Sequence, residues 1–372
     1  MSAQDTEIFR KLQQRLDTLP IGYPATKSGV ELRILKSLFT PKEAEVAVKM
    51  SFIPESVEKI YRRVKKIVAS KDELREILDN MYHNGAINVH RTNEGNGEEI
   101  QYHLAFLAVG MYEYQVGTLT KDFYEDIEEY FDEAYRDEVI STKINQLRTI
   151  PIEESITPDH NIATFDELSK IIRKTNKIAV MECICQKGKE LINKPCKQTE
   201  MREHCFALNS SAQHVVDLNN GKFVTNDEAL LILKKAQEEG LILQPGNALD
   251  PNFICCCCGC CCDLITNIKK LERPWELFYS NFIASVDSDL CIGCESCLNR
   301  CQMDAIEMVE NIATLNQNLC IGCGNCVVTC SEEAITLEKK EKELIPPNTT
   351  KDLFLKIMDK KAELRRKEKG VL

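Results

Sequence analysis

The first 182 residues of this 372-residue chain contain no cysteine, and no long apolar run occurs anywhere in it. The longest apolar stretch, around Leu104–Met111, is far shorter than the roughly 20 residues that a membrane-spanning helix needs. Residues Met1–Leu19 are charged and lack the apolar core of a secretory signal peptide. Acidic residues outnumber basic ones, which gives a net charge of −11. These absences predict a cytoplasmic protein that has no membrane span and that binds neither nucleic acid nor an anionic membrane surface.

Several common catalytic motifs are also missing from the sequence. It contains no phosphate-binding G-x-x-x-x-G-K-[ST] loop, no dinucleotide fingerprint after a strand and no nucleophile elbow. The sequence therefore predicts no catalytic residue.

Cysteine is abundant in the second half, where all 19 cysteines lie between Cys183 and Cys330. A disulfide framework is typical of short secreted chains, and this chain fits neither description. Cysteines at tight spacings in a reducing compartment instead indicate metal ligation.

The patterns along the chain predict an α+β protein with four regions. In the first region, a helix over Ser70–Asn84 is followed by two strands, Ile87–Arg91 and Ile100–Leu104, which is typical of a winged helix. Later regions differ mainly in cysteine content. The predicted domains are a helical winged-helix-like domain at 1–145, a Cys-rich α/β middle domain at 146–284, a repeat domain at 285–345 and a charged C-terminal helix or tail at 346–372.

Winged helices often bind DNA, so a redox-sensing regulator is one hypothesis. The element before the hairpin is the recognition helix, and Ser70–Asn84 carries four acidic against two basic residues. Phosphates would repel such a helix. A protein-docking module is therefore the preferred interpretation of this domain.

An internal repeat lies within the third region, where Asp289-Leu-Cys-Ile-Gly-Cys recurs as Asn318-Leu-Cys-Ile-Gly-Cys. Each copy has the spacing C-x2-C-x2-C-x3-C. A 4Fe-4S cubane needs four converging thiolates, whereas zinc ribbons use paired C-x2-C knuckles. The repeat thus predicts two 4Fe-4S clusters, held by Cys291, Cys294, Cys297 and Cys301 of the first copy and Cys320, Cys323, Cys326 and Cys330 of the second.

This region resembles the two-cluster bacterial ferredoxins, and the resemblance implies that the fourth cysteines cross over. It assigns Cys291, Cys294, Cys297 and Cys330 to one cluster, and Cys320, Cys323, Cys326 and Cys301 to the other. The proline that usually follows each fourth cysteine is replaced by Gln302 and Ser331. Two additional backbone N–H groups near the clusters could alter hydrogen bonding and reduction potential.

One group of cysteines in the middle region has four members, which is the number that one cluster needs, with no additional cysteine. We predict that these four hold a further 4Fe-4S cluster. A zinc site or unliganded thiols are the alternatives. The four are Cys183, Cys185, Cys196 and Cys205.

The run Cys255–Cys262 places seven thiols in eight positions, with Gly259 as a turn. Adjacent side chains cannot all face one core, so the run indicates ligands for a fourth cluster or a redox-active dithiol. The subset is open; the candidates are Cys255, Cys257, Cys258, Cys260, Cys261 and Cys262.

The order of these features resembles a family of anaerobic multi-cluster 4Fe-4S proteins. In that family the second position of the cysteine run is usually Asn, which argues against Cys256 as a ligand. The resemblance implies electron transfer within anaerobic oxidoreductase assemblies.

The predicted function is the relay of single low-potential electrons between a donor and a redox partner, as an electron-transfer subunit of an oxidoreductase complex. The first alternative is an iron–sulfur enzyme subunit with a catalytic cluster or reactive thiol at Cys255–Cys262. The second is the DNA-binding regulator.

Overall fold

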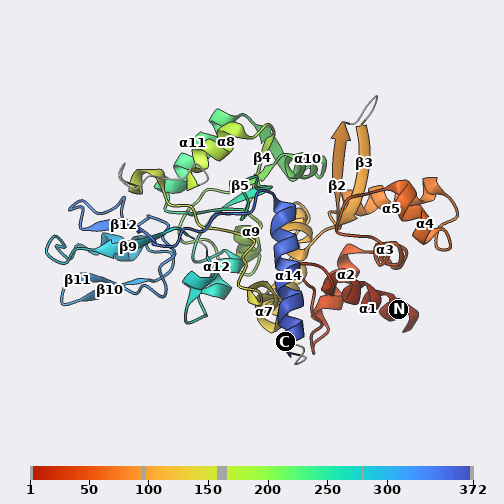
Figure 1. The fold of residues 1–372 in the computed structure, drawn as a ribbon, viewed down its shortest axis with the longest axis horizontal. Coiled ribbons are helices and arrows are strands. Elements are labelled where there is room, and N and C mark those ends of the chain that lie inside the picture. Colours follow the sequence, from red (N-terminus) through yellow and green to blue (C-terminus); the bar gives the residue numbers. More distant parts are fainter. Residues whose placement is uncertain (1–2, 94–97, 157–165, 279, 369–372) are drawn as a thin grey trace. The chain divides into compact units, whose positions relative to one another are not determined.

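The computed structural model describes residues 3–93, 98–156, 166–278 and 280–368, which form helices and several small antiparallel sheets (Figure 1). The predicted mixed α+β class is confirmed. The chain divides into two compact units. Unit 1 comprises Met1–Val139 and Ser210–Lys222, and unit 2 comprises Ile140–Asn209 and Phe223–Leu372.

Unit 1 is mainly helical. Helix α5 buries Leu74, Leu78 and Met81 on one face and leads into the hairpin of β2 and β3, to which β1 adds as a third strand. A helix followed by a hairpin is the order of elements expected of a winged helix. The assignment of this domain as winged-helix-like remains a prediction. The elements are α1 (Ala3–Asp17), α2 (Val30–Leu38), α3 (Pro41–Ala47), β1 (Glu55–Ser56), α4 (Val57–Val64), α5 (Lys71–His83), β2 (Ile87–Asn93), β3 (Glu98–Leu104), α6 (Lys121–Tyr130), α7 (Arg136–Ile140) at the unit boundary and α10 (Ser210–Asp217).

Helix α10 comes from the middle of the chain but belongs to unit 1. The hydroxyl of Tyr82 donates to Asp217 at 2.6 Å, and Arg91 donates to the same carboxylate at 2.9 Å. The ring of His214 stacks on Tyr82 with centroids 4.1 Å apart. Through these contacts α10 packs in unit 1, although about 70 residues of sequence separate it from Val139, the last residue of the first segment of that unit.

His214 makes the stability of unit 1 depend on pH. Burial lowers the pKa of His214 to about 4, so the unfolded chain takes up a proton at pH values where the folded chain does not. The stabilisation is complete above pH 6.5 and is lost as the pH falls towards 4. We expect the His214→Gln variant to lose less stability over this interval than the parent, by on the order of 3 kcal/mol at most. Hydrogen exchange of the α5 amides, corrected for intrinsic rates, measures this; equal pH slopes would contradict it.

Unit 2 is built on a five-stranded sheet with the order β6-β4-β5-β8-β7. Helices α8 and α11 pack against one face, and α12 and the repeat region pack against the other (Figure 1). Thr225 and Glu228 form a capping box that begins α11, as a Thr-x-x-Glu sequence favours. The elements are α8 (Leu168–Lys174), β4 (Ile178–Glu182), α9 (Ile184–Leu191), β5 (Glu203–Leu208), β6 (Gly221–Val224), which begins in unit 1, α11 (Asn226–Glu238), β7 (Ile242–Pro245), β8 (Phe253–Cys257) and α12 (Asp263–Ile268).

The repeat region lies within unit 2 and contains two small antiparallel sheets. Strand β9 (Phe282–Val286) pairs with β12 (Ile335–Lys339), and β10 (Ile306–Val309) pairs with β11 (Ile312–Leu315). Helix α13 (Ser296–Arg300) carries cysteines of the first copy. The pairing of β9 with β12 therefore brings together the two ends of the repeat region.

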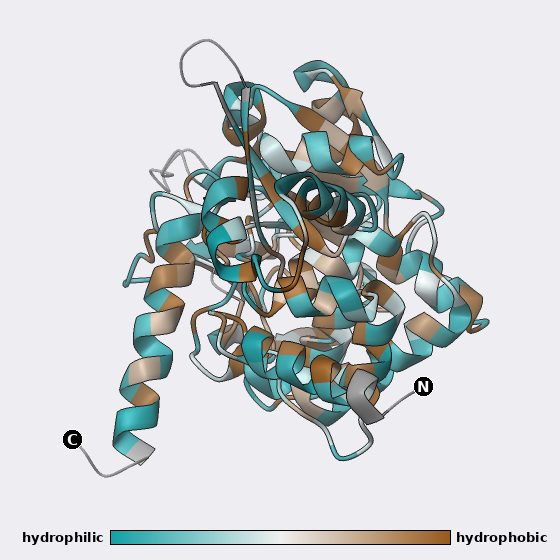
Figure 2. Cartoon of the chain, turned by 90° about the vertical axis from the view of Figure 1, so that its right-hand side faces the viewer, coloured by the Kyte–Doolittle hydropathy of each residue, from teal (hydrophilic) through white to brown (hydrophobic). Residues whose placement is uncertain are grey.

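The C-terminal helix α14 (Thr350–Glu368) alternates hydrophobic and hydrophilic stretches along its length (Figure 2). Its residues Leu353 and Ile357 are buried, while Leu355 is exposed. Among the described residues, no helix combines the length and the apolar character that crossing a membrane requires.

Candidate metal centres

One cavity of the repeat region is lined by cysteines from both copies of the repeat. Cys320, Cys323 and Cys326 belong to the second copy, and Cys301 is the fourth cysteine of the first. Burial raises the pKa of Cys323 to about 12, and the charges of Cys301 and Cys320 add to this effect. Four thiols thus converge on one largely apolar hollow.

The first copy presents its remaining cysteines at a more exposed edge. Cys294 is exposed, whereas Cys297 on α13 is buried. Burial raises the pKa of Cys297, with a further contribution from the charges of Cys291 and Cys294. Cys330 of the second copy is half-buried and packs against the same core as Cys297.

Backbone N–H groups donate to two sulfurs of the first copy. The N–H of Ala305 donates to Cys301 Sγ at 3.3 Å, and the N–H of Ala313 donates to Cys291 Sγ at 3.4 Å. Such N–H groups stabilise the negative charge of cluster-bound thiolates. The thiol sets and their donors therefore fit 4Fe-4S clusters.

A glycine lets the second cysteine loop approach the sheet closely. Gly322 has φ +65°, and a Cβ at this position would lie 2.1 Å from the carbonyl oxygen of Phe282 on β9. Only glycine accommodates both the conformation and the contact. The sequence motif Cys-Ile-Gly-Cys is explained by this approach.

Four thiols of the middle region meet in a second kind of arrangement, which we call the four-thiol site. Sulfur–sulfur distances are 3.7 Å from Cys196 to both Cys258 and Cys260, 3.5 Å from Cys260 to Cys258 and 3.7 Å from Cys260 to Cys261. All four sulfurs lie within 4.8 Å of one another. Cys258 and Cys261 are buried, and the other two are half-buried.

Six further thiols form a closed chain of contacts, which we call the six-thiol ring. The thiol of Cys183 interacts with those of Cys185 and Cys205, which lowers the pKa of Cys183 well below its usual value despite burial. On the other side, the thiol of Cys257 interacts with those of Cys255 and Cys262. The ring is completed by contacts of Cys185 with Cys262 and of Cys205 with Cys255.

Local structure explains why these thiols meet. Alternation along β8 places Cys255 and Cys257 on the face that packs against the repeat region, and Cys256 on the opposite face. Cys183 is the residue at the N-cap position of α9, and Cys262 is the residue at the N-cap position of α12. The ring therefore lies where two strands run into two helices.

Three buried polar side chains near the six-thiol ring have atoms without a hydrogen-bond partner. His204, 1% exposed, bonds Gln186 through Nε2 at 3.1 Å, while its Nδ1 and Gln186 Nε2 have no partner. His204 also lies close to Cys183 and Cys205. Gln244 is opposite Cys255 in the sheet, fully buried, and neither atom of its amide is satisfied. Buried polar groups are normally paired, so these atoms favour a polar or charged group at the ring.

The structure does not bring together the four cysteines predicted as one set from the middle region. Cys196 lies in the four-thiol site, whereas Cys183, Cys185 and Cys205 lie in the six-thiol ring. The run Cys255–Cys262 is likewise divided between the two groups. Cys256 belongs to neither and packs into the core beneath α8 and α11, where burial raises its pKa.

Gln302, which replaces the usual proline, connects the repeat region to the cysteine run. Its Oε1 accepts a hydrogen bond from the N–H of Gly259 at 2.8 Å. Gln302 is buried, and a Cβ on Gly259 would lie 2.1 Å from its carbonyl oxygen. The two cysteine-rich regions are thus in direct backbone contact.

Replacing Gln302 with methionine keeps the volume but leaves the Gly259 N–H without this acceptor. We expect the free energy of unfolding to fall by about 1–3 kcal/mol. The matched variant Ser331→Ala changes the exposed equivalent position of the second copy, and we expect a change within about 0.5 kcal/mol. Urea unfolding without oxygen measures both. Equal effects would show that the Gln302 contact contributes nothing.

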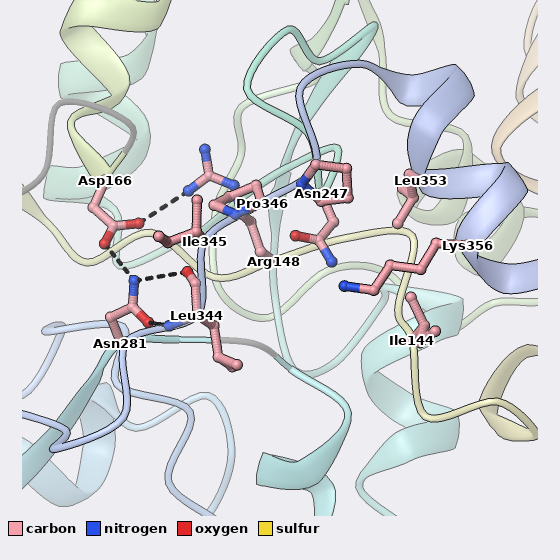
Figure 3. A pocket seen from close by; sticks show the side chains of 11 residues that line it. Ile144, Arg148, Asp166, Asn247, Asn281, Leu344, Ile345, Pro346, Leu353 and Lys356 are labelled. Atoms are coloured by element: carbon pink, nitrogen blue, oxygen red, sulfur yellow. Dashed lines mark hydrogen bonds and ion pairs between the residues drawn. The ribbon is translucent and has the colours of Figure 1, made fainter. Parts of the chain in front are cut away.

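A separate cavity of about 80 Å³ is lined by a buried ion pair (Figure 3). Arg148 donates to Asp166 at 3.0 Å, and Asn281 donates to the other carboxylate oxygen at 2.8 Å. Asn281 also accepts from the N–H of Leu344 at 2.8 Å. Burial lowers the pKa of Arg148 to about 10. This network fixes the segment before α14 to unit 2 and contains no cysteine among its described lining residues.

Clustered thiols with backbone N–H donors define this chain as an iron–sulfur protein. Its residues 283–334 match a family described as a 4Fe-4S dicluster domain. No curated protein and no solved structure matches the chain.

Proposed function

We propose that this chain relays single low-potential electrons between a donor and a partner oxidoreductase, as a subunit of an anaerobic oxidoreductase complex. Clusters of the 4Fe-4S type supply the one-electron chemistry when bound. The observation that carries the proposal is the repeat region, in which thiols of both copies converge and the dicluster family matches. The reaction itself would take place in the partner.

The cavity supports the crossed assignment of ligands. We assign Cys301 to the cluster of the second copy because it lines one hollow with Cys320, Cys323 and Cys326. The other cluster then takes the remaining thiols of the region, which are Cys291, Cys294, Cys297 and Cys330.

The edge of the first copy is the place at which we propose electron exchange with the partner. Cys294 is exposed there, and its neighbours Leu290 and Ile292 are 50% and 66% exposed. Exposed apolar side chains beside a redox centre suit a docking contact that excludes water.

Iron and acid-labile sulfide analysis together with film voltammetry, on protein purified without oxygen, tests this function. We expect about eight or more iron atoms per chain, at four per cubane, and reversible one-electron couples in the lower part of the roughly −700 to +450 mV range of protein iron–sulfur clusters. Iron without a reversible couple would overturn the relay function.

A second candidate function is favoured by the six-thiol ring. Six thiols are two more than one cubane uses, and the unpartnered atoms of His204, Gln186 and Gln244 lie beside them. A cluster or reactive thiol at this ring would make the middle region catalytic.

Two serine variants of the same strand test this candidate. Cys257 belongs to the ring and Cys256 faces the opposite core, so Cys256→Ser is the matched control. If the ring is catalytic, Cys257→Ser loses partner-dependent turnover and Cys256→Ser retains it. Full turnover in Cys257→Ser would leave the relay function standing and exclude this candidate.

A further inference from the structure

The four-thiol site differs from the cysteine sets of the repeat region in how closely its sulfurs approach. Four of its sulfur–sulfur distances lie between 3.5 and 3.7 Å, and all four sulfurs lie within 4.8 Å of one another. Two segments far apart in sequence supply them, with Cys196 on one and Cys258, Cys260 and Cys261 on the other. The arrangement is a compact cluster of four sulfurs.

Those distances match a single tetrahedral metal ion. With metal–sulfur bonds of about 2.3 Å, the edge of a regular tetrahedron of sulfurs is about 3.8 Å. In a cubane each thiolate binds a different iron at the corner of a larger body, so the sulfurs lie farther apart. The site therefore has the dimensions of a mononuclear centre.

The surroundings favour a closed structural site. Cys258 and Cys261 are 3% and 1% exposed, and all four ligand positions of a tetrahedral ion are filled by thiols. Four thiolates without an open position are typical of structural zinc.

We propose that the four-thiol site binds one Zn²⁺ ion. The segment 192–202 contains no regular helix or strand, and Cys196 is its contact with the cysteine run. The ion thus fastens this loop to the turn that follows β8. Since Cys257 and Cys262 flank the same turn, zinc also sets the position of the six-thiol ring. The proposal is independent of the relay function, which rests on the repeat region.

Metal analysis of the full chain, produced with both iron and zinc supplied and purified without oxygen, tests the proposal. We expect about one zinc per chain and a zinc X-ray absorption spectrum with four sulfurs at about 2.3 Å. Cys196→Ser should lose the zinc and keep the iron of the repeat region, while Cys256→Ser should keep both metals. Because the absorption spectrum is measured on the unsubstituted protein, the test does not depend on the variant folding.

Iron at the site would overturn the proposal in either of two forms. Loss of about four iron atoms in Cys196→Ser, with no zinc in the parent, would indicate a cubane. Loss of a single iron would indicate a mononuclear iron centre. Neither result would affect the redox couples of the repeat region, so the failure of the zinc proposal is separable from failure of the relay function.

Discussion

The Cys301→Ala variant is expected to lose about four iron atoms per chain, which are those of one cubane. The reason is geometric: Cys301 lines the same hollow as Cys320, Cys323 and Cys326, although it follows the cysteines of the first copy in sequence. The iron that is lost should therefore belong to the second copy.

Double variants identify which cluster is lost. Cys323→Ala combined with Cys301→Ala removes two ligands of one cluster, so the loss stays at about four iron atoms. Cys294→Ala combined with Cys301→Ala removes one ligand from each cluster, so the loss rises to about eight. Iron and sulfide per chain, relative to the parent, are measured for both. The reverse order of losses would show that each copy ligates its own cluster.

The Gly322→Ala variant is expected to lose more than about 4 kcal/mol of stability and to purify with incomplete iron. A left-handed backbone costs alanine about 1–2 kcal/mol. The larger cost is the added methyl group, placed 2.1 Å from the rigid carbonyl oxygen of Phe282, which forces the cysteine loop away from β9.

Gly240 provides the matched control in the same unit. Its φ is +78°, but the nearest atoms to a Cβ there belong to a side chain, the guanidinium of Arg300 at 2.8 Å, and not to rigid backbone. We expect Gly240→Ala to cost about 1–2 kcal/mol and to keep its iron. Thermal unfolding without oxygen and iron analysis compare the two. A Gly322→Ala protein with full iron and the stability of Gly240→Ala would contradict the proposed close approach.

Local sequence signals predicted much of the fold. The helix predicted over Ser70–Asn84 is present as α5, and its N-cap residue Ser70 accepts a hydrogen bond from the N–H of Glu73, because caps act within one turn of chain. The repeated spacing of the third region predicted its 4Fe-4S character, and the family match supports this.

The grouping of the middle cysteines could not be predicted in the same way. Cys196 was grouped with its nearest neighbours in sequence, but the structure places it with Cys258 and Cys260. That contact depends on the order of strands β4, β5 and β8, which no local pattern encodes. Alternation along β8 was the one available signal, since it separates Cys256 from Cys255 and Cys257.

Because the two units are interleaved in sequence, their segments are synthesised in a fixed alternating order. Unit 1 is completed by Ser210–Lys222, which leaves the ribosome after Cys205 and before Cys255. A nascent chain that has reached Asn209 has made half of the six-thiol ring but still lacks Asp217, the carboxylate that Tyr82 and Arg91 bind. The synthesis of the cysteine-free unit is therefore completed between the two groups of ring cysteines, and none of the thiol sets of this chain is complete before it.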